Sequence, residues 1–335
     1  MRKPTTTKIF ILGAGASRAS DSSMPVMRDF FQGLESCGDQ FKVLSEFLKT
    51  HFEFVPGLPA MPNIETVFCY LENRLEAIGH DSEKYAVLLQ VRAQLTNFIS
   101  RRLRYGEERS KLPQLQRLVE VANHRSFVTF NWDVLLEEAL EPHGSYYFAR
   151  QHFVLSGGRG WELGEDVTKG FLLKLHGSIN WYTCLQPNCP NRGRTLRHGN
   201  ASYEPTRWDI DDLGRGCDVC GQDLERALVP PIAGKRGRMP VGVLRQWTLA
   251  REALEKADEW VIIGYSMPQL DMEAESLFRA CRKSSTGETP SVLIVDLDPE
   301  PVRDRFHTFL GASAEIKTMR SLDEYLEAEE GRAQQ

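Results

Sequence analysis

Residues 8–17 read KIFILGAGAS, in which the apolar run Lys8–Leu12 passes straight into two glycines separated by an alanine. The run has the branched and large apolar side chains of a buried parallel strand. A Gly-Ala-Gly turn directly after such a strand lets the backbone approach a pyrophosphate group closely, although an ordinary tight turn is the alternative interpretation. The third glycine of the dehydrogenase fingerprint would fall at Arg18, which makes hydride transfer the less favoured dinucleotide chemistry.

Four more apolar runs of this kind follow, and each passes into small, polar or titratable residues at its carboxyl end. Helical patterns or long insertions separate the runs, as crossover connections require. The sequence therefore predicts an α/β fold with a doubly wound, Rossmann-like parallel sheet, whose carboxyl edge is the place where ligands bind. The runs and the residues after them are Ser126–Thr129 with Phe130-Asn131-Trp132-Asp133, Phe171–Leu175 with His176-Gly177-Ser178, Glu259–Ile263 with Gly264-Tyr265-Ser266, and Ser291–Val295 with Asp296-Leu297-Asp298.

The segments between these strands suggest how the chain is divided. We expect a Rossmann-like core in residues 5–30, 125–182 and 228–325, an inserted helical layer in 31–124, and a small zinc-binding lobe in 183–227. Within the layer, apolar residues recur at helical spacing in Glu65–Ile78 and Lys84–Leu103. The residues from Glu327 onward have the composition of a polar tail.

Four cysteines in the small lobe form two close pairs. Four residues separate Cys184 from Cys189, and two separate Cys217 from Cys220. Two such pairs in a segment with few apolar residues predict a tetrahedral four-thiolate zinc site, and its role would be structural because no position remains open for water. A set of unrelated thiols is the alternative.

His176 and the Asn131/Asp133 pair are the candidates for chemistry at the sheet edge. An imidazole has an unperturbed pKa that suits proton removal near neutral pH, although a single histidine is more often a surface or core residue. Asn131 and Asp133 alternate along an extended segment, so their side chains should point the same way. An amide and a carboxylate can bind a ribose hydroxyl or a carboxamide. Asp133 can also cap the helical segment Val134–Leu140, and this role is compatible with ligand binding.

Composition narrows the function classes. The formal charge of −5 over 335 residues disfavours direct binding of a nucleic-acid backbone. The basic cluster of Arg101, Arg102, Arg104 and Lys111 is interleaved with acidic residues, which favours a solvated helix face over a nucleic-acid contact. No membrane-length apolar stretch and no secretory signal are found, which predicts a cytoplasmic protein without a membrane partner.

Taken in order, these motifs resemble those of the sirtuin (Sir2-type) NAD-binding family. The resemblance covers about residues 8–298 and implies one sirtuin-like domain over 1–335, with NAD as the substrate and Zn²⁺ as a structural metal. The matching segments are Gly13-Ala14-Gly15-Ala16-Ser17 with the first NAD-binding loop, Thr129-Phe130-Asn131-Trp132-Asp133 with the Thr-Gln-Asn-x-Asp stretch, Leu175-His176-Gly177-Ser178 with the catalytic His-Gly, Cys184 with the first zinc cysteine, and Gly264-Tyr265-Ser266 with the later Gly-Thr-Ser loop.

Residue roles are implied by this resemblance. His176 would be the general base, with Asn131 and Asp133 at the nicotinamide end. The pyrophosphate loop is Gly13, Ala14, Gly15 and Ser17; Gly264 and Ser266 would line the nucleotide, and Asp296 would meet the adenosine ribose.

Three departures bear on the reaction. Phe130 replaces the family's Gln, residues 141–170 are an insertion, and Leu228–Lys235 with two prolines stands where deacylases carry a Phe-Gly-Glu segment that pairs with the acyl-peptide. This combination is similar to bacterial antiphage-defence sirtuin-like NADases, which implies NAD hydrolysis to nicotinamide and ADP-ribose, a homo-oligomer, and a partner such as an ATPase, a nuclease or a phage-derived activator. The alternatives are an NAD-dependent protein deacylase or ADP-ribosyltransferase, and a non-catalytic NAD sensor.

Overall fold

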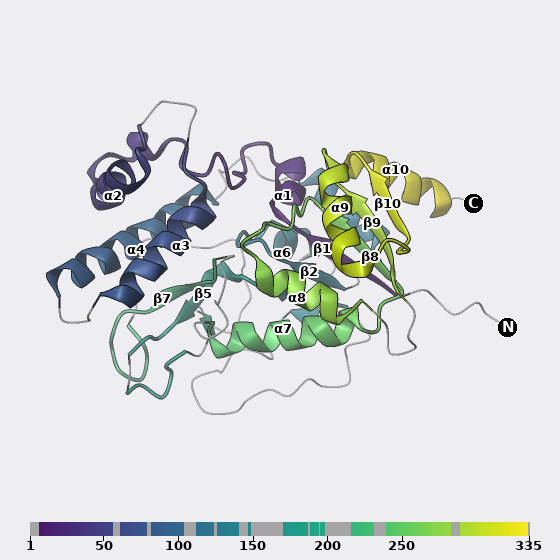
Figure 1. The fold of residues 1–335 in the computed structure, drawn as a ribbon. Coiled ribbons are helices and arrows are strands. Elements are labelled where there is room, and N and C mark those ends of the chain that lie inside the picture. Colours follow the sequence, from purple (N-terminus) through teal and green to yellow (C-terminus); the bar gives the residue numbers. More distant parts are fainter. Residues whose placement is uncertain are drawn as a thin grey trace.

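The centre of the molecule is a parallel sheet with the strand order β10-β9-β8-β1-β2-β4-β3 (Figure 1). The computed structural model describes residues 7–55, 61–78, 82–103, 112–123, 126–140, 147–148, 170–186, 188–193, 195–197, 216–230, 239–282 and 289–333. The strands are β1 Lys8–Leu12, β2 Phe127–Thr129, β3 Tyr147–Phe148, β4 Phe171–Lys174, β8 Glu259–Ile263, β9 Ser291–Val295 and β10 Ile316–Met319. Every one of the five predicted runs forms a strand of this sheet, so the predicted doubly wound α/β fold is confirmed.

The strands are all parallel, but the side of the sheet on which the chain adds new strands changes at β1. From β1 the chain passes to β2 and then β4 on one side, whereas β8, β9 and β10 extend the sheet on the other side. The crevice at the carboxyl ends of β1 and β8 is therefore a topological switch point, where open α/β sheets bind ligands. Strand β10 was not predicted, because this edge strand is only partly buried and lacks a continuous apolar run.

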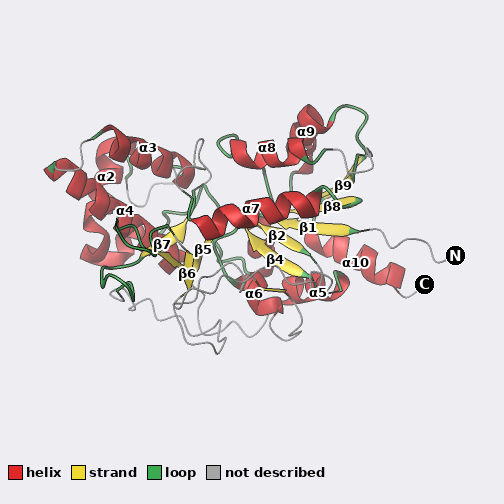
Figure 2. Cartoon of the chain, turned by 90° about the horizontal axis from the view of Figure 1, so that it is seen from below, coloured by secondary structure: helices red, strands yellow, loops and turns green. Residues whose placement is uncertain are grey.

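Helices cover both faces of the sheet, which explains why strands such as β1 are apolar on both sides (Figure 2). One face carries α7 Val241–Leu254, α8 Met272–Ala280 and α9 Pro299–Leu310, and the other carries α5 Pro113–Val121, α6 Leu135–Leu140 and α10 Leu322–Ala333. The predicted polar tail is wrong for residues 327–333, which belong to α10. Arg117 of α5 donates to both carboxylate oxygens of Glu330 at 2.8 Å and so holds this last helix in place.

The described residues between 31 and 103 form a layer of helices beside the sheet (Figure 1). After α1 Ala14–Ser20, the layer contains η1 Leu34–Phe41, α2 Lys42–Phe52, α3 Ile64–Ala77 and α4 Glu83–Arg102. The two predicted helices correspond to α3 and α4, which begin at the side-chain caps Asn63 and Ser82. None of the described helices has the length and apolarity that a bilayer span requires.

A second, antiparallel sheet in the order β6-β5-β7 adjoins the helical layer. Its strands are β5 Gly177–Thr183, β6 Thr195–Arg197 and β7 Glu225–Leu228. Arg92 of α4 donates to Glu72 of α3 at 2.8 Å and also bonds Glu225 of β7. One guanidinium thereby joins the helical layer to the small sheet.

A buried ion pair fastens α6 to the central sheet. Lys174 at the end of β4 lies 2.7 Å from Glu137 and also donates to the backbone carbonyl of Asp133. Both paired side chains are 1% exposed. Removal of one charge would leave the other buried without its partner, which is far more costly than replacing both.

We therefore expect Glu137→Gln to lower the free energy of unfolding by about 3–5 kcal/mol. Replacing the pair together, as Lys174→Met with Glu137→Leu, should restore a large part of the loss. Urea denaturation measures both, with Glu252→Gln on the exposed face of α7 as the control, which should change stability by less than about 0.5 kcal/mol. Equal stabilities for the two Gln variants would contradict the assigned role of the pair.

Candidate functional site

The loops after β1 and β8 touch through their backbones. The amide of Gly15 donates to the carbonyl oxygen of Gly264 at 2.9 Å. Gly264 has φ +58°, and a Cβ atom there would lie 2.3 Å from the amide nitrogen of Ala16. A Cβ on Gly13 would likewise lie 2.4 Å from the Gly264 carbonyl oxygen. Only glycine fits at these positions, because backbone occupies the space that a side chain would need.

A cavity of about 80 Å³ opens at this switch point. Among the predicted site residues, it brings together Gly13, Ala14, Ser17, Asn131, Asp133 and His176. Gly15 and Gly264 stand behind it as packing residues, and neither they nor Ser266 and Asp296 line it. The helical layer contributes Ile64, Glu65 and Leu103 to its wall, and the segment between α1 and η1 contributes Pro25, Met27 and Phe30.

The hydroxyl of Ser17 connects the polar side chains of the cavity. It donates to Asp133 Oδ2 at 2.8 Å and accepts from Asn131 Nδ2 at 3.0 Å, so the two side chains from the β2 loop do point the same way. Asn131 Nδ2 also donates to the Gly13 carbonyl oxygen at 2.9 Å. Asp133 Oδ1 accepts from the Leu135 amide at 3.1 Å, which is the predicted cap of α6. A ligand that binds these groups must exchange bonds that they already make.

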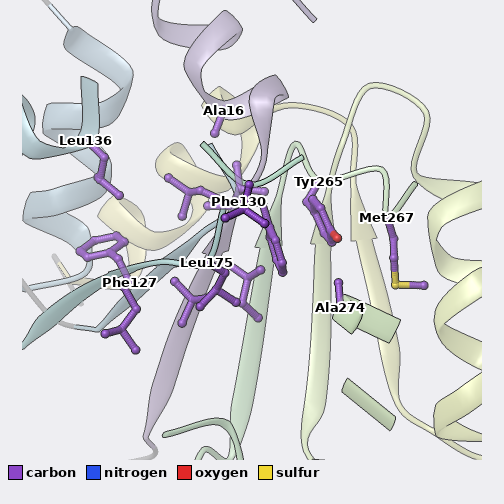
Figure 3. Close-up of a cluster of buried hydrophobic side chains, with 14 of the residues drawn as sticks. Ala16, Phe127, Phe130, Leu136, Leu175, Tyr265, Met267 and Ala274 are labelled. Carbon is purple, nitrogen blue, oxygen red and sulfur yellow. The ribbon is translucent and has the colours of Figure 1, made fainter. Parts of the chain in front are cut away.

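His176 lies in an aromatic enclosure at the end of β4. The centroid of its ring lies 5.1 Å from that of Phe130 and 6.1 Å from that of Trp247. The rings of Phe130 and Tyr265 are stacked, with their centroids 4.2 Å apart (Figure 3). On its polar side, Nε2 lies 3.1 Å from Asp271 Oδ2. The imidazole is thus buried, it lines the cavity, and it contacts a carboxylate.

Three titratable residues of the cavity were not predicted as site residues. Asp271 precedes α8 and has the sequence signal of an ordinary helix cap. Glu65 lies in the first turn of α3, where an acidic residue is expected for the helix dipole. Tyr265 was noted only as part of a loop. Burial, and next the nearby Asp271, raise its pKa well above the ordinary value.

Two predicted nucleotide contacts lie farther along the sheet edge. The carbonyl of Ser266 accepts a hydrogen bond from Arg305, which fixes the loop after β8. Asp296 directly follows β9, and its Oδ1 accepts from the Asp298 amide at 3.0 Å. Burial raises the pKa of Asp296.

The basic cluster of Arg101, Arg102, Arg104 and Lys111 is described only in part. Arg101 donates to the Gln40 side chain and Arg102 donates to the Phe30 carbonyl, whereas residues 104 and 111 lie outside the described residues.

The segment that follows β7 lies against the backbone of His176. The amide of Val229 donates to the His176 carbonyl at 2.9 Å, and the Val229 carbonyl accepts from the indole of Trp132 at 3.3 Å. Gly177 has φ +75°, and a Cβ there would lie 1.8 Å from the Ala227 carbonyl, so this junction requires glycine. Of Leu228–Lys235, residues 231–235 lie outside the described residues, as do 141–146 and 149–169 of the insertion.

The four cysteine sulfurs lie within 4.8 Å of one another. Cys184 and Cys220 are 3.7 Å apart, and so are Cys189 and Cys217. A tetrahedral zinc site with metal–sulfur bonds of about 2.3 Å has sulfur–sulfur edges of about 3.8 Å, so the four residues fit this metal. Burial acts to raise the pKa of the Cys217 thiol, but the Cys220 and Val219 amides outweigh it and lower the pKa to about 7.

We expect the purified protein to contain about one zinc ion per chain. Cys217→Ser should remove the metal and lower Tm, because three thiolates no longer complete the tetrahedron and the described part of the lobe packs around this small buried cluster. Metal content and thermal unfolding are the measurements, with Cys69→Ser on α3 as the matched control. Zinc retained at full stoichiometry in Cys217→Ser would contradict the site.

Comparison with protein-family models and with curated proteins gives no match. Among solved structures, the chain is similar to Sir2 in complex with an inhibitor, 2'-O-acetyl-ADP-ribose and a deacetylated p53 peptide, with TM-score 0.42 and 14% identity over 98% of this chain and 94% of that chain. It is similar to a mutant Sir2 homologue in complex with 2'-O-acetyl ADP ribose, with TM-score 0.44, 17% identity and the same coverage. It is also similar to Sir2 bound to acetylated peptide, with TM-score 0.44 and 14% identity over 98% and 93%. These likenesses are distant, so the function is argued from this chain's own residues.

Proposed function

We propose that the protein binds NAD in the switch-point cavity and hydrolyses the nicotinamide–ribose bond. The observation that carries the proposal is a buried histidine in the same cavity as a glycine turn and a Ser-Asn-Asp hydrogen-bonded network. Glycine turns at this place in a doubly wound sheet suit a dinucleotide, and an imidazole suits proton transfer near neutral pH. The resemblance of the motifs to those of sirtuins supports the same assignment.

The individual roles follow from the contacts. Asn131 and Asp133 would position the ribose and the carboxamide, because their side chains share the Ser17 hydroxyl and face the cavity. Ala14 and Ser17 would contact the pyrophosphate. Gly15 has its amide bonded to Gly264, so its part is to permit close backbone approach. Ser266 and Asp296 would extend the nucleotide site along the sheet edge.

The chemistry requires one base. The C1′–N bond breaks and its electron pair moves to the pyridinium nitrogen, so that nicotinamide leaves as a neutral molecule. Water forms the new bond to C1′ and transfers a proton to His176, which leaves ADP-ribose. The positive charge that develops on the ribose would be stabilised by the carboxylate of Asp133, which is held in place before the reaction by Ser17 and the α6 cap.

Hydrolysis is favoured over deacylation by the backbone of Val229. An acyl-peptide that added a strand here would need unpaired amide and carbonyl groups on the segment after β7. Val229 already donates to His176 and accepts from Trp132, and the next residue, Pro230, has no amide hydrogen. The resemblance further suggests a homo-oligomer that acts in antiphage defence together with a partner protein.

Incubation of the purified protein with NAD alone should yield nicotinamide and ADP-ribose. His176→Ala should lower the rate at least about 100-fold, because water loses its proton acceptor, while NAD still binds. Chromatography of the products and calorimetry of NAD binding provide the two measurements. His307→Ala on α9 is the matched control and should retain activity; equal rates for both variants would remove His176 from the mechanism.

An acetylated peptide added to the same reaction tests the alternative. We expect it to leave the rate of NAD loss unchanged and to remain acylated, since Val229 offers no strand edge. Mass spectrometry of the peptide and of the ADP-ribose product decides this. NAD loss that depends on the peptide, with O-acyl-ADP-ribose as the product, would make the protein a deacylase.

A further inference from the structure

We propose that Asp271 is a positioning residue that fixes the tautomer of His176, so that Nδ1 is the nitrogen that takes up the proton. The inference rests on the proposed function for the identity of the reaction. The pairing of the two side chains, however, is a property of the fold, and it can be measured by NMR independently of activity.

Asp271 is a rigid acceptor. Its side chain is 0% exposed, and its Oδ2 accepts from the Tyr265 hydroxyl at 3.0 Å. Its Oδ1 faces the Ala274 amide at 3.4 Å and caps α8. A carboxylate held from both sides cannot turn away from His176 Nε2, which lies 3.1 Å from the oxygen that Tyr265 also bonds.

The chemistry of the three groups fixes the proton positions. Burial, and then Asp271, raise the pKa of Tyr265 well above its ordinary value, so the phenol stays a neutral donor. A carboxylate only accepts, so the ring nitrogen that faces it must carry hydrogen. Nε2 is therefore the protonated nitrogen of neutral His176, and the lone pair is on Nδ1.

The surroundings of the ring support the same orientation. Phe130 and Trp247 flank it at 5.1 and 6.1 Å, which limits its rotation. The described titratable groups around the cavity are Tyr265 and Asp271 before α8, Asp133 before α6, and Glu65 of α3. Asp271 is the carboxylate for which a direct contact with the ring is seen, so it would stabilise the imidazolium that forms when water is deprotonated.

Asp271→Asn is the decisive variant. Asparagine keeps the size of the side chain and its helix-capping oxygen, but its amide donates toward His176 and reverses the tautomer. We expect kcat for NAD cleavage to fall at least about 100-fold with KM little changed. The acid limb of the rate profile should move to lower pH, because the imidazolium loses its negative partner. Asp304→Asn on the exposed side of α9 is the matched control.

Nitrogen NMR of ring-labelled histidine reads the tautomer without reference to activity. The signal of His176, identified by its absence in His176→Gln, should show Nε2–H in the wild type and Nδ1–H in Asp271→Asn. Tyr265→Phe should keep the wild-type tautomer with a smaller loss of kcat, because Asp271 loses one donor but keeps His176. This variant and the wild-type spectrum remain informative if Asp271→Asn does not fold.

The outcomes separate the two proposals. An Nδ1–H tautomer in the wild type, or full activity with an unshifted pH profile in Asp271→Asn, would overturn the role of Asp271. If the wild type cleaves no NAD, or if His176→Ala cleaves it at the same rate, the proposed function fails. The NMR result on the Asp271–His176 pair would still stand in that case.

Discussion

The site depends on a close contact between two backbone turns. The Gly13-Ala14-Gly15 turn after β1 lies against Gly264 after β8, with no room for a Cβ atom on either side. This contact joins the two halves of the doubly wound sheet at β1, where the chain changes the side on which it adds strands. It sets where α1 begins, and therefore where Ser17 meets the side chains from β2. A side chain at Gly264 would separate the halves and open the cavity.

Within the cavity, polar groups are arranged by one another before any ligand arrives. Ser17, Asn131 and Asp133 form one hydrogen-bonded set, and Asp133 is held from behind by Lys174 through its backbone carbonyl. Lys174 in turn pairs with Glu137, so a buried ion pair supports the carboxylate that faces the cavity. Such an arrangement would avoid reorganisation during the proposed cleavage, in which positive charge develops on the ribose.

Two of the departures from the sirtuin motifs have structural consequences in the fold. Phe130, in place of a polar Gln, stacks on Tyr265 (Figure 3). Its ring also packs against the edge of His176. Trp132 donates to the Val229 carbonyl, so the segment after the small lobe is joined to the loop after β2. The two aromatic residues therefore line the cavity from the loop after β2. The cavity is enclosed by the chain's own side chains and by the helical layer.

The sequence by itself determined the five strand ends, the glycine turn, the two helices α3 and α4 and the paired cysteines, because each is a local pattern of apolar spacing, turn chemistry or ligand spacing. It did not determine β10, whose edge position leaves no apolar run, or the helical state of residues 327–333, which depends on Arg117 reaching Glu330 from a distant helix. Only the tertiary structure brought Asp271 and Glu65 to the cavity. In the sequence both have the signal of an ordinary helix terminus, and the pairing of Asp271 with His176 joins residues 95 positions apart across the sheet edge. Local patterns specify elements, whereas a partner across the fold exists only after the core has packed.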